Sequence, residues 1–274
     1  MPVDLDAAVV ANTRLSADYN VVSFAGAEIA SFARPGQFVM VKPSRGTDPL
    51  LRRPFSIFQI LRDAAGEATG FSILNKRIGV GTRRLYDVEA GARLAVLGPL
   101  GRPFDAVPPP AEGWMVAGGV GLAPFLTLAE SLRDAGTSAT LFYGARSGAE
   151  LFYVDAFEQL GVRTVLATED GSRGARGRVT VPLADGLSTK ALARLYACGP
   201  TPMMHAVARL AASHGRPCDV SLEQTMGCGL GGCYSCVVAA REVAARDEPP
   251  RLVRSCLEGP VFDASRIVWE ALAH

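Results

Sequence analysis

The stretch Gly227-Cys228-Gly229-Leu230-Gly231-Gly232-Cys233-Tyr234-Ser235-Cys236, with a further cysteine at 256, decides most of what this sequence predicts. Its cysteines follow the pattern C-x4-C-x2-C with a distant fourth cysteine, which is the spacing of plant-type [2Fe–2S] ligands. Thiolates are soft ligands that suit iron–sulfur clusters. We therefore expect a [2Fe–2S] cluster bound by four thiolates, those of Cys228, Cys233, Cys236 and Cys256.

The glycines of this loop support the same prediction. A loop around a compact cluster needs unusual backbone φ values, which glycine reaches without a Cβ clash. It also brings N–H groups close to the sulfurs, where hydrogen bonds tune the reduction potential. A structural zinc site is the alternative, although zinc usually takes short paired C-x2-4-C motifs. Disulfides are disfavoured in a long chain that starts without an export signal, and Cys198 and Cys218 lie outside the loop.

Composition excludes several classes of function. The chain has 274 residues, of which 49% are hydrophobic and 20% charged, and its formal net charge is +1. That length suggests about two domains and a small third. A near-neutral chain has no global field for nucleic acid, and no window has the apolar length of a membrane span. With only three histidines, a His-based metal site or triad is not expected. We expect a cytoplasmic protein.

Residues 1–107 are predicted to form an antiparallel β-barrel. Short runs rich in β-forming residues, separated by turn residues, lie at 9–10, 19–24, 37–41, 55–60 and 70–74. Several short strands at such spacing favour a barrel. The proline-rich stretch Val107-Pro108-Pro109-Pro110 follows as a linker.

Residues 111–215 are predicted to form an open parallel α/β domain. Strand-like runs at 114–117, 139–143, 163–167 and 193–197 alternate with helical patterns at 122–132, 153–160 and 205–214. Such alternation is typical of a parallel sheet covered by helices. Residues 216–274 form a third unit, which is too small to bury much core, so we expect the cluster to stabilise it.

Two segments of the first domain suit a phosphate-bearing cofactor. Arg53 precedes Pro54-Phe55-Ser56 in a strand-like run, and a guanidinium pairs well with pyrophosphate. The hydroxyl of Ser56 is placed to reach a flavin ring nitrogen. Gly79-Val80-Gly81-Thr82 leads into a helical run, whose start favours an anion, with Thr82 as N-cap or phosphate contact. Each segment alone also fits an ordinary edge strand or a capped surface helix.

Two glycine turns of the second domain lie at carboxyl ends of predicted strands, where open α/β sheets bind ligands. Gly118-Gly119-Val120-Gly121-Leu122-Ala123-Pro124 has the strand–turn–helix context of a nucleotide loop. It departs from G-x-G-x-x-G because Pro124 replaces the last glycine. The other turn is Cys198-Gly199-Pro200. A tight turn without ligand, and Cys198 as a small buried residue, stay open as alternatives. Glu169-Asp170 is interpreted as a solvated turn or a contact to nucleotide hydroxyls.

Taken in order, these motifs resemble the ferredoxin-reductase-like flavoproteins. With the cysteine loop at the C-terminus, they resemble the electron transfer subunits of class 1B, NAD-dependent dihydroorotate dehydrogenases. The motifs Gly98-Pro99-Leu100-Gly101 and Ser221-Leu222-Glu223-Gln224-Thr225-Met226 add to the likeness. The resemblance implies an FAD-binding barrel, an NAD-binding α/β domain and a small [2Fe–2S] domain.

The resemblance also implies roles for individual residues. By motif, the flavin and its phosphates would be held by Arg53, Pro54, Phe55, Ser56, Leu74, Asn75, Lys76, Gly81 and Thr82. The NAD pocket would be framed by Gly118, Gly119, Gly121, Pro124, Cys198, Gly199 and Pro200. No catalytic acid or base is expected, because direct hydride transfer needs orientation and electrostatic tuning instead.

The partner implied by the resemblance is an FMN-containing dihydroorotate dehydrogenase catalytic subunit, in a heterotetramer with two copies of each chain, in pyrimidine biosynthesis. A (β/α)8 barrel of about 250 residues would not fit beside the domains predicted here, so the orotate site would lie on the partner. Rival partners are a hydrogenase, a sulfite reductase or the NADH-dependent ferredoxin–NADP oxidoreductase system. A zinc-bound nucleotide-sensing module is the non-redox alternative.

Two features depart from the family pattern. The gap between the last two cysteines carries an insert around Arg246-Asp247-Glu248-Pro249-Pro250, and the pair Tyr234-Ser235 stands inside the cysteine loop, where we expect it to alter the cluster's environment. The choice between NAD and NADP stays open, because Arg146, Arg173 or Arg176 could meet a 2′-phosphate.

Overall fold

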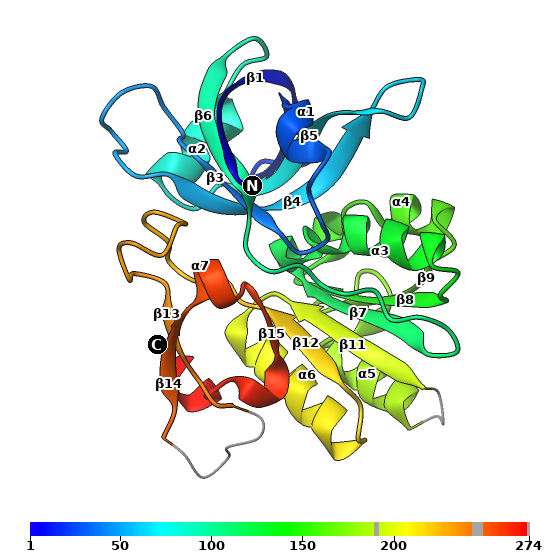
Figure 1. The fold of residues 1–274 in the computed structure, drawn as a ribbon. Helices are drawn as coiled ribbons and strands as arrows, with labels where there is room; N and C mark the ends of the chain where they lie inside the picture. Colours follow the sequence, from blue (N-terminus) through cyan, green and yellow to red (C-terminus); the bar gives the residue numbers. More distant parts are fainter. Residues whose placement is uncertain (189–191, 243–248, 273–274) are drawn as a thin grey trace.

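The computed structural model describes residues 1–188, 192–242 and 249–272. They form a closed barrel, a seven-stranded sheet and a two-stranded ribbon. Figure 1 shows the barrel above the sheet, with the ribbon and the C-terminal residues beside the sheet and below the barrel. Residues Arg246-Asp247-Glu248 of the predicted insert lie outside the described part of the chain. No helix in that part is long and apolar enough to cross a membrane.

The barrel confirms the antiparallel prediction and adds one strand to it. Its strand order is β1-β2-β5-β4-β3-β6. The bounds are β1 (Val3–Arg14), β2 (Tyr19–Ala25), β3 (Phe38–Val41), β4 (Arg53–Arg62), β5 (Ala68–Lys76) and β6 (Arg93–Leu100), with the helices α1 (Ala27–Ala30) and α2 (Val80–Asp87). The sequence did not reveal β6, although Leu94 and Val96 alternate into the core as strand residues do.

The sheet is parallel except at one edge and has the order β10-β9-β8-β7-β11-β12-β15. Its strands are β7 (Glu112–Gly118), β8 (Ala139–Ala145), β9 (Arg163–Thr168), β10 (Ala175–Arg176), β11 (Ala193–Cys198), β12 (Cys218–Ser221) and β15 (Val261–Asp263). The chain moves outward from β7 to β10 and then restarts on the other side at β11. The crevice between β7 and β11 is therefore the switch point at which such sheets bind ligands.

Helices cover both faces of this sheet (Figure 1). One face carries α3 (Phe125–Asp134) and α4 (Val154–Gln159), and the other carries α5 (Thr180–Leu187) and α6 (Thr201–Ser213). The helix predicted from residue 122 begins three residues later. Gly119–Leu122 forms a 3-10 turn (η1), and Pro124 is the N-cap of α3. A further 3-10 turn, η2 (Gly148–Glu150), precedes α4.

The C-terminal segment is divided between the sheet and the ribbon. The ribbon pairs β13 (Val237–Ala240) with β14 (Arg251–Arg254), followed by α7 (Ser255–Glu258), η3 (Ala264–Arg266) and η4 (Trp269–Leu272). In contrast, β12 and β15 are strands of the sheet. The division at residue 216 stays a prediction, and residues on its C-terminal side contribute to the sheet of the second domain.

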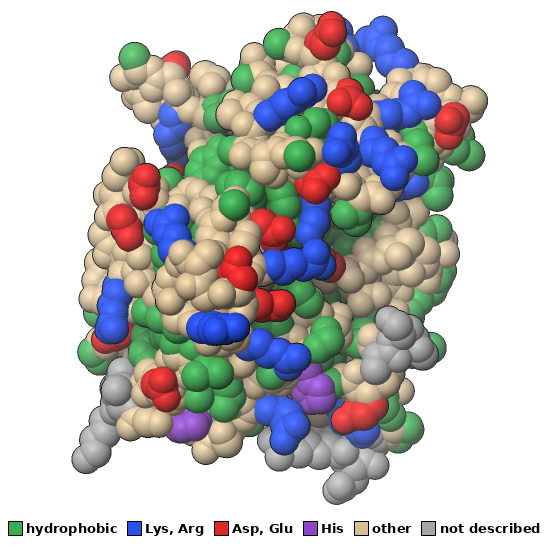
Figure 2. All heavy atoms as spheres, turned by 180° about the vertical axis from the view of Figure 1, so that it is seen from behind, with side chains coloured by type: hydrophobic (Ala, Val, Ile, Leu, Met, Phe, Trp, Pro, Cys, Tyr) green, Lys and Arg blue, Asp and Glu red, His purple; other side chains and the backbone are tan. Residues whose placement is uncertain are grey.

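Charged residues of both signs are spread over the surface. On the face opposite to that of Figure 1, Lys and Arg side chains lie beside Asp and Glu side chains (Figure 2). Several form exposed ion pairs, such as Arg34 with Asp105 at 3.0 Å and Arg84 with Asp48 at 3.2 Å. Exposed pairs of this kind contribute at most about 1 kcal/mol each to stability. The fold therefore depends on its apolar cores.

Candidate functional site

The structure brings together two segments that the sequence suggested for a phosphate-bearing cofactor. A Cβ on Gly81, in the first turn of α2, would lie 3.4 Å from Cγ and 3.6 Å from Nε of Arg53 at the start of β4. Among the described residues, Arg53 donates to the carbonyls of Leu51 and Arg52 alone. In the described part of the chain no carboxylate forms a salt bridge with it. An unpaired guanidinium beside a helix N-terminus fits a pyrophosphate.

Thr82 occupies a different helix position from the predicted one. The N-cap of α2 is Gly79, and Thr82 is the N3 residue. Its hydroxyl accepts hydrogen bonds from the N–H groups of Ile78 and Gly79, both at 2.9 Å. The N-cap prediction for Thr82 was therefore wrong, because glycine at 79 leaves the capping to the N3 side chain. The Thr82 hydroxyl binds the N–H groups that precede the helix. The first helical N–H groups have no partner within a helix and are available for an anion.

Buried asparagine side chains form hydrogen bonds to the backbone of α2. Asn75 donates to Oδ1 of Asn20 at 2.7 Å and to the carbonyl of Thr82 at 3.0 Å. Asn20 in turn donates to Asn12 at 2.7 Å and to the carbonyl of Leu85 at 3.0 Å. The buried Oδ1 of Asn75 has no partner among the described residues. Asn75 thus fixes the start of α2, and its free acceptor suits a donor supplied by a cofactor.

The two glycine turns of the sheet lie in direct contact. A Cβ on Gly121 would lie 2.2 Å from the carbonyl oxygen of Cys198, and one on Gly118 would lie 2.7 Å from Sδ of Met203. Gly199 has a φ of +143°, and a Cβ on Gly199 would lie 3.0 Å from the backbone N and O atoms of Gly118. Only residues without a Cβ allow these backbones to approach so closely. The two turns frame the crevice between β7 and β11, as predicted from their strand context.

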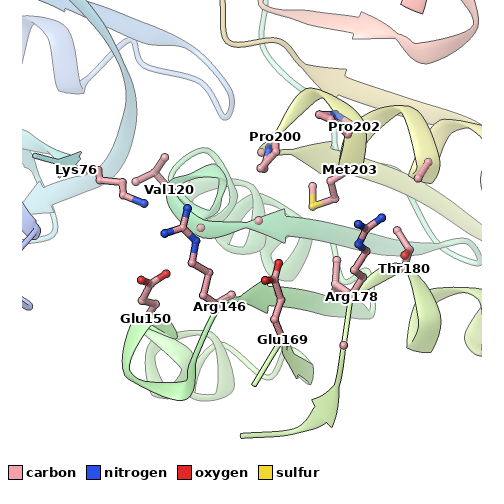
Figure 3. A pocket seen from close by; sticks show the side chains of 18 of the residues that line it. Lys76, Val120, Arg146, Glu150, Glu169, Arg178, Thr180, Pro200, Pro202 and Met203 are labelled. Atoms are coloured by element: carbon pink, nitrogen blue, oxygen red, sulfur yellow. The ribbon is translucent and has the colours of Figure 1, made fainter. Parts of the chain in front are cut away.

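A cavity of about 450 Å³ opens at this crevice. Gly118, Gly119, Gly199 and Pro200 line it from the turns, and the barrel contributes Lys76. Figure 3 shows Lys76 and Arg146 pointing into the cavity at one end, with Arg178 and Glu169 further along. A glycine cradle, cationic side chains and a volume in the range of small-molecule sites fit a dinucleotide.

Several residues that line the cavity were not predicted as binding residues from the sequence. They are Tyr19, Glu150, Arg178, Thr180, Met203 and Glu223. Glu223 lies in the run before the cysteines that carried the family likeness, and its carboxyl faces the cavity within protein surroundings, so desolvation raises its pKa. Arg178 follows a glycine-rich loop, which was the signal available for it in the sequence.

The sequence also predicted that certain arginines and Cys198 lie at this cavity, and the structure agrees for one arginine only. Arg146 lines it but Arg173 and Arg176 do not, and Arg178 takes their place. The thiol of Cys198 is 2% exposed and is not part of the lining, and burial raises its pKa. Cys198 therefore packs as a buried residue behind the turn. Leu74 is likewise buried, whereas Phe55 and Ser56 are half-buried.

The cysteine loop adopts the backbone conformations that its glycines suggested. Gly229 and Gly231 have φ values of +73° and +80°. Leu230 donates its N–H to Sγ of Cys228 at 3.4 Å, which is the kind of contact that stabilises a cluster sulfur. Cys233 is exposed, Cys228 is half-buried, and Cys236 and Cys256 are buried.

The surroundings of Cys233 and Cys256 shift their pKa values in opposite directions. Hydrogen bonds from Ser235, and next from Cys228, lower the pKa of Cys233 to about 6. Burial, and next the neighbouring Cys236, raise the pKa of Cys256 to about 12. Over residues 1–188, 192–242 and 249–272, no three His, Cys, Asp or Glu side chains are arranged to hold a single metal ion. The spacing of the cysteines and the positive φ values of Gly229 and Gly231 fit a loop around a two-iron cluster.

The cysteine loop packs against the barrel. Met226, Cys236 and Cys256 share a buried cluster with Phe38, Met40 and Leu100 of the barrel strands. Met40 also pairs with Pro54 across β3 and β4. One barrel strand therefore separates the suggested flavin strand from the cysteines.

Comparisons with known proteins agree with this arrangement. The family profile described as "Oxidoreductase NAD-binding domain" matches residues 115–209. The profile "Iron-sulfur cluster binding domain of dihydroorotate dehydrogenase B" matches residues 223–268. Both matches lie over the segments described above.

Two relatives cover nearly the whole chain. The "Dihydroorotate dehydrogenase B (NAD(+)), electron transfer subunit" of Desulforamulus reducens is 36% identical over 265 residues, which are 97% of this chain and 98% of that protein. The protein of the same name from Geobacillus thermodenitrificans is 39% identical over 252 residues, or 90% and 91% of the two chains.

Solved structures show the same fold. A chain from the study "Insights into flavin-based electron bifurcation via the NADH-dependent reduced ferredoxin-NADP oxidoreductase structure" superposes with a TM-score of 0.83 and 28% identity, covering 98% of this chain and 92% of that one. "Ferredoxin reductase in carbazole 1,9a-dioxygenase" gives a TM-score of 0.67 at 23% identity, covering 79% and 67%.

Proposed function

Since this chain belongs to the family of dihydroorotate dehydrogenase B (NAD(+)) electron transfer subunits, we propose that it passes electrons between a catalytic partner subunit and NAD. The cofactors are a [2Fe–2S] cluster, FAD and NAD(H). The partner is the FMN-containing catalytic subunit, in a heterotetramer with two copies of each chain. The protein is thus an oxidoreductase component of pyrimidine biosynthesis, and we place it in the cytoplasm, where cysteines remain reduced.

One observation carries this proposal. The barrel touches both of the other two sites: Tyr19 and Lys76 of the barrel line the NAD cavity, and Met40 packs against the cysteine loop. The suggested flavin strand, β4, lies between them in the barrel wall. A flavin exchanges two electrons with nicotinamide and one at a time with an iron–sulfur cluster, so its place is between the two.

The residues of this chain bind and orient. Arg53 and the first turn of α2 hold the flavin pyrophosphate, and the Asn75 side chain keeps that turn in place. The turns at Gly118 and Gly199 cradle the dinucleotide, whose phosphates meet Arg146 and Arg178 in the cavity. The four cysteines hold the cluster, with Cys233 nearest to solvent.

The partner is proposed to dock over the cysteine loop. Three large apolar side chains are exposed there: Leu230 (56%), Tyr234 (62%) and Leu257 (43%). Gly231 packs directly against Leu257, because a Cβ there would lie 2.5 Å from its Cδ1. An apolar surface around the exposed ligand Cys233 suits a protein interface across which electrons leave.

The test uses cluster-loaded, FAD-loaded protein purified without oxygen. Addition of NADH should bleach the flavin absorbance and produce the EPR signal of a reduced [2Fe–2S] cluster. Addition of the catalytic subunit and dihydroorotate should then convert NAD+ to NADH. A colourless zinc protein, or a flavin that NADH does not reduce, would overturn the proposal.

The second candidate keeps the cofactors and changes the partner. It is favoured by the solved structure with 28% identity, whose title names an NADH-dependent reduced ferredoxin–NADP oxidoreductase. The same loaded protein would then reduce ferredoxin, with no NADH formed from dihydroorotate when the catalytic subunit is present.

A further inference from the structure

The pair Tyr234-Ser235 has a specific arrangement inside the cysteine loop. The Oγ of Ser235 lies 3.2 Å from Sγ of Cys233. The same oxygen accepts a hydrogen bond from the N–H of Gly227 at 2.9 Å. A Cβ on Gly227 would lie 3.2 Å from Sγ of Cys233, so these three residues are in mutual contact. The hydroxyl of Ser235 is held between a backbone donor and a ligand sulfur.

The direction of the hydrogen bond to the sulfur follows from chemistry. A cysteine that ligates iron is a thiolate and has no hydrogen to donate. Ser235 already accepts from Gly227, so its own hydroxyl hydrogen is available for Cys233. In the cluster-loaded protein, Ser235 must therefore be the donor and Cys233 Sγ the acceptor.

The backbone at Tyr234, next to Ser235, has a strained conformation. Tyr234 has a φ of +58°, which is an outlier for a bulky residue and often marks a functional constraint. Arg254 holds the turn: its guanidinium lies 5.0 Å from the centre of the Tyr234 ring, and it donates to the carbonyl of Gly231 at 2.9 Å. The turn thus has its own support outside the cluster ligands.

We propose that Ser235 is a positioning residue that raises the reduction potential of the cluster through its hydrogen bond to Cys233. The inference rests on the proposed function, since it concerns the cluster that these cysteines hold. One-electron reduction would make the cluster and its four thiolates together more negative by one unit of charge. A donor at a ligand sulfur therefore stabilises the reduced form more than the oxidised form.

The test is a redox titration monitored by EPR on the loaded protein and three variants. Ser235→Ala should lower the one-electron equilibrium constant about tenfold, equivalent to a shift of about 59 mV to lower potential. Ser235→Thr keeps the hydroxyl and should stay near wild type. Ser213→Ala removes an exposed hydroxyl at the end of α6, which contacts only Leu210 and His214 among the described residues, and should leave the potential unchanged.

A spectroscopic measurement covers the case in which Ser235→Ala does not retain the cluster. The hydroxyl hydrogen that Ser235 donates to Sγ of Cys233 is exchangeable, so the Fe–S(Cys) stretching bands of the wild type should be sensitive to D2O in resonance Raman spectra. Equal potentials for loaded wild type and Ser235→Ala, or wild-type bands that do not move in D2O, would overturn this inference alone. A wild-type protein without any cluster would overturn the proposed function as well.

Discussion

The side chain of Met40 fills the space that a Cβ on Gly229 would occupy, with its Cγ only 2.6 Å from that position. Met40 is fully buried in β3, and Gly229 follows the first cluster ligand. The barrel and the cysteine loop therefore meet without any space between them. This contact holds the cysteine loop against β3, the strand that pairs with the suggested flavin strand β4.

Gly229→Ala should destabilise the cysteine loop. Its φ of +73° costs a residue with a Cβ about 1–2 kcal/mol, and the new methyl group would also displace Met40. We expect less iron per chain and a lower midpoint of thermal unfolding. Gly232→Ala is the matched control in the same loop, because a Cβ there meets no heavy atom of the described residues within 4 Å. Equal iron content in the two variants would contradict this explanation.

Arg53→Ala should weaken FAD binding. Loss of a hydrogen bond to a charged group costs about 1.5–3 kcal/mol, which corresponds to about 10–100-fold in the dissociation constant. Fluorescence titration of the flavin-free protein with FAD measures this change. The control is Arg52→Ala, since the neighbouring Arg52 forms an ion pair with Asp4 at 2.8 Å. Similar losses in both variants would show that Arg53 has no special role.

Glu169→Ser should relax the preference for NADH over NADPH. Glu169 lines the cavity just after β9, where its negative charge would repel a 2′-phosphate. Removal of the carboxylate leaves Arg146 and Arg178 to attract that group, so we expect the ratio of kcat/KM for NADPH to that for NADH to rise about tenfold. Glu150→Gln, which removes another carboxylate of the cavity, is the control. An unchanged ratio in Glu169→Ser would exclude this residue as the determinant.

The cysteines of cluster-free protein should react in a fixed order. Because hydrogen bonds from Ser235 lower the pKa of Cys233 to about 6, this exposed thiol is mostly thiolate at neutral pH. Burial raises the pKa of Cys256 to about 12, so it stays protonated. Iodoacetamide should label Cys233 first at neutral pH, with a rate that falls as the pH drops through about 6.

Mass spectrometry of the labelled peptides checks this order. Cys218, whose pKa is raised by burial, serves as the internal unreactive control. Labelling of Cys256 before Cys233 would contradict the prediction.

The sequence by itself determined the barrel followed by an α/β domain and both glycine turns of the sheet, and it predicts the four cysteine ligands. These features depend on local rules, namely ligand spacing, alternation of strand residues and the freedom of glycine at positive φ. Local rules also misplaced some details. Thr82 caps from N3 because Gly79 precedes it, and β6 was not predicted although Leu94 and Val96 alternate into the core.

Only the tertiary structure decided how these parts meet. Met40 against Gly229, Arg53 beside Gly81, and Lys76 in the NAD cavity are contacts between residues far apart in the chain. No local pattern encodes them, because they arise from tertiary packing, within the barrel for Arg53 and Gly81 and between the barrel and other parts of the chain for Met40 and Lys76. The same holds for β12 and β15, whose pairing places the segment before the cysteines in the sheet. Arg178 likewise became a candidate only when the strand ends were brought to one cavity, whereas the sequence left Glu169 open between a solvated turn and a nucleotide contact.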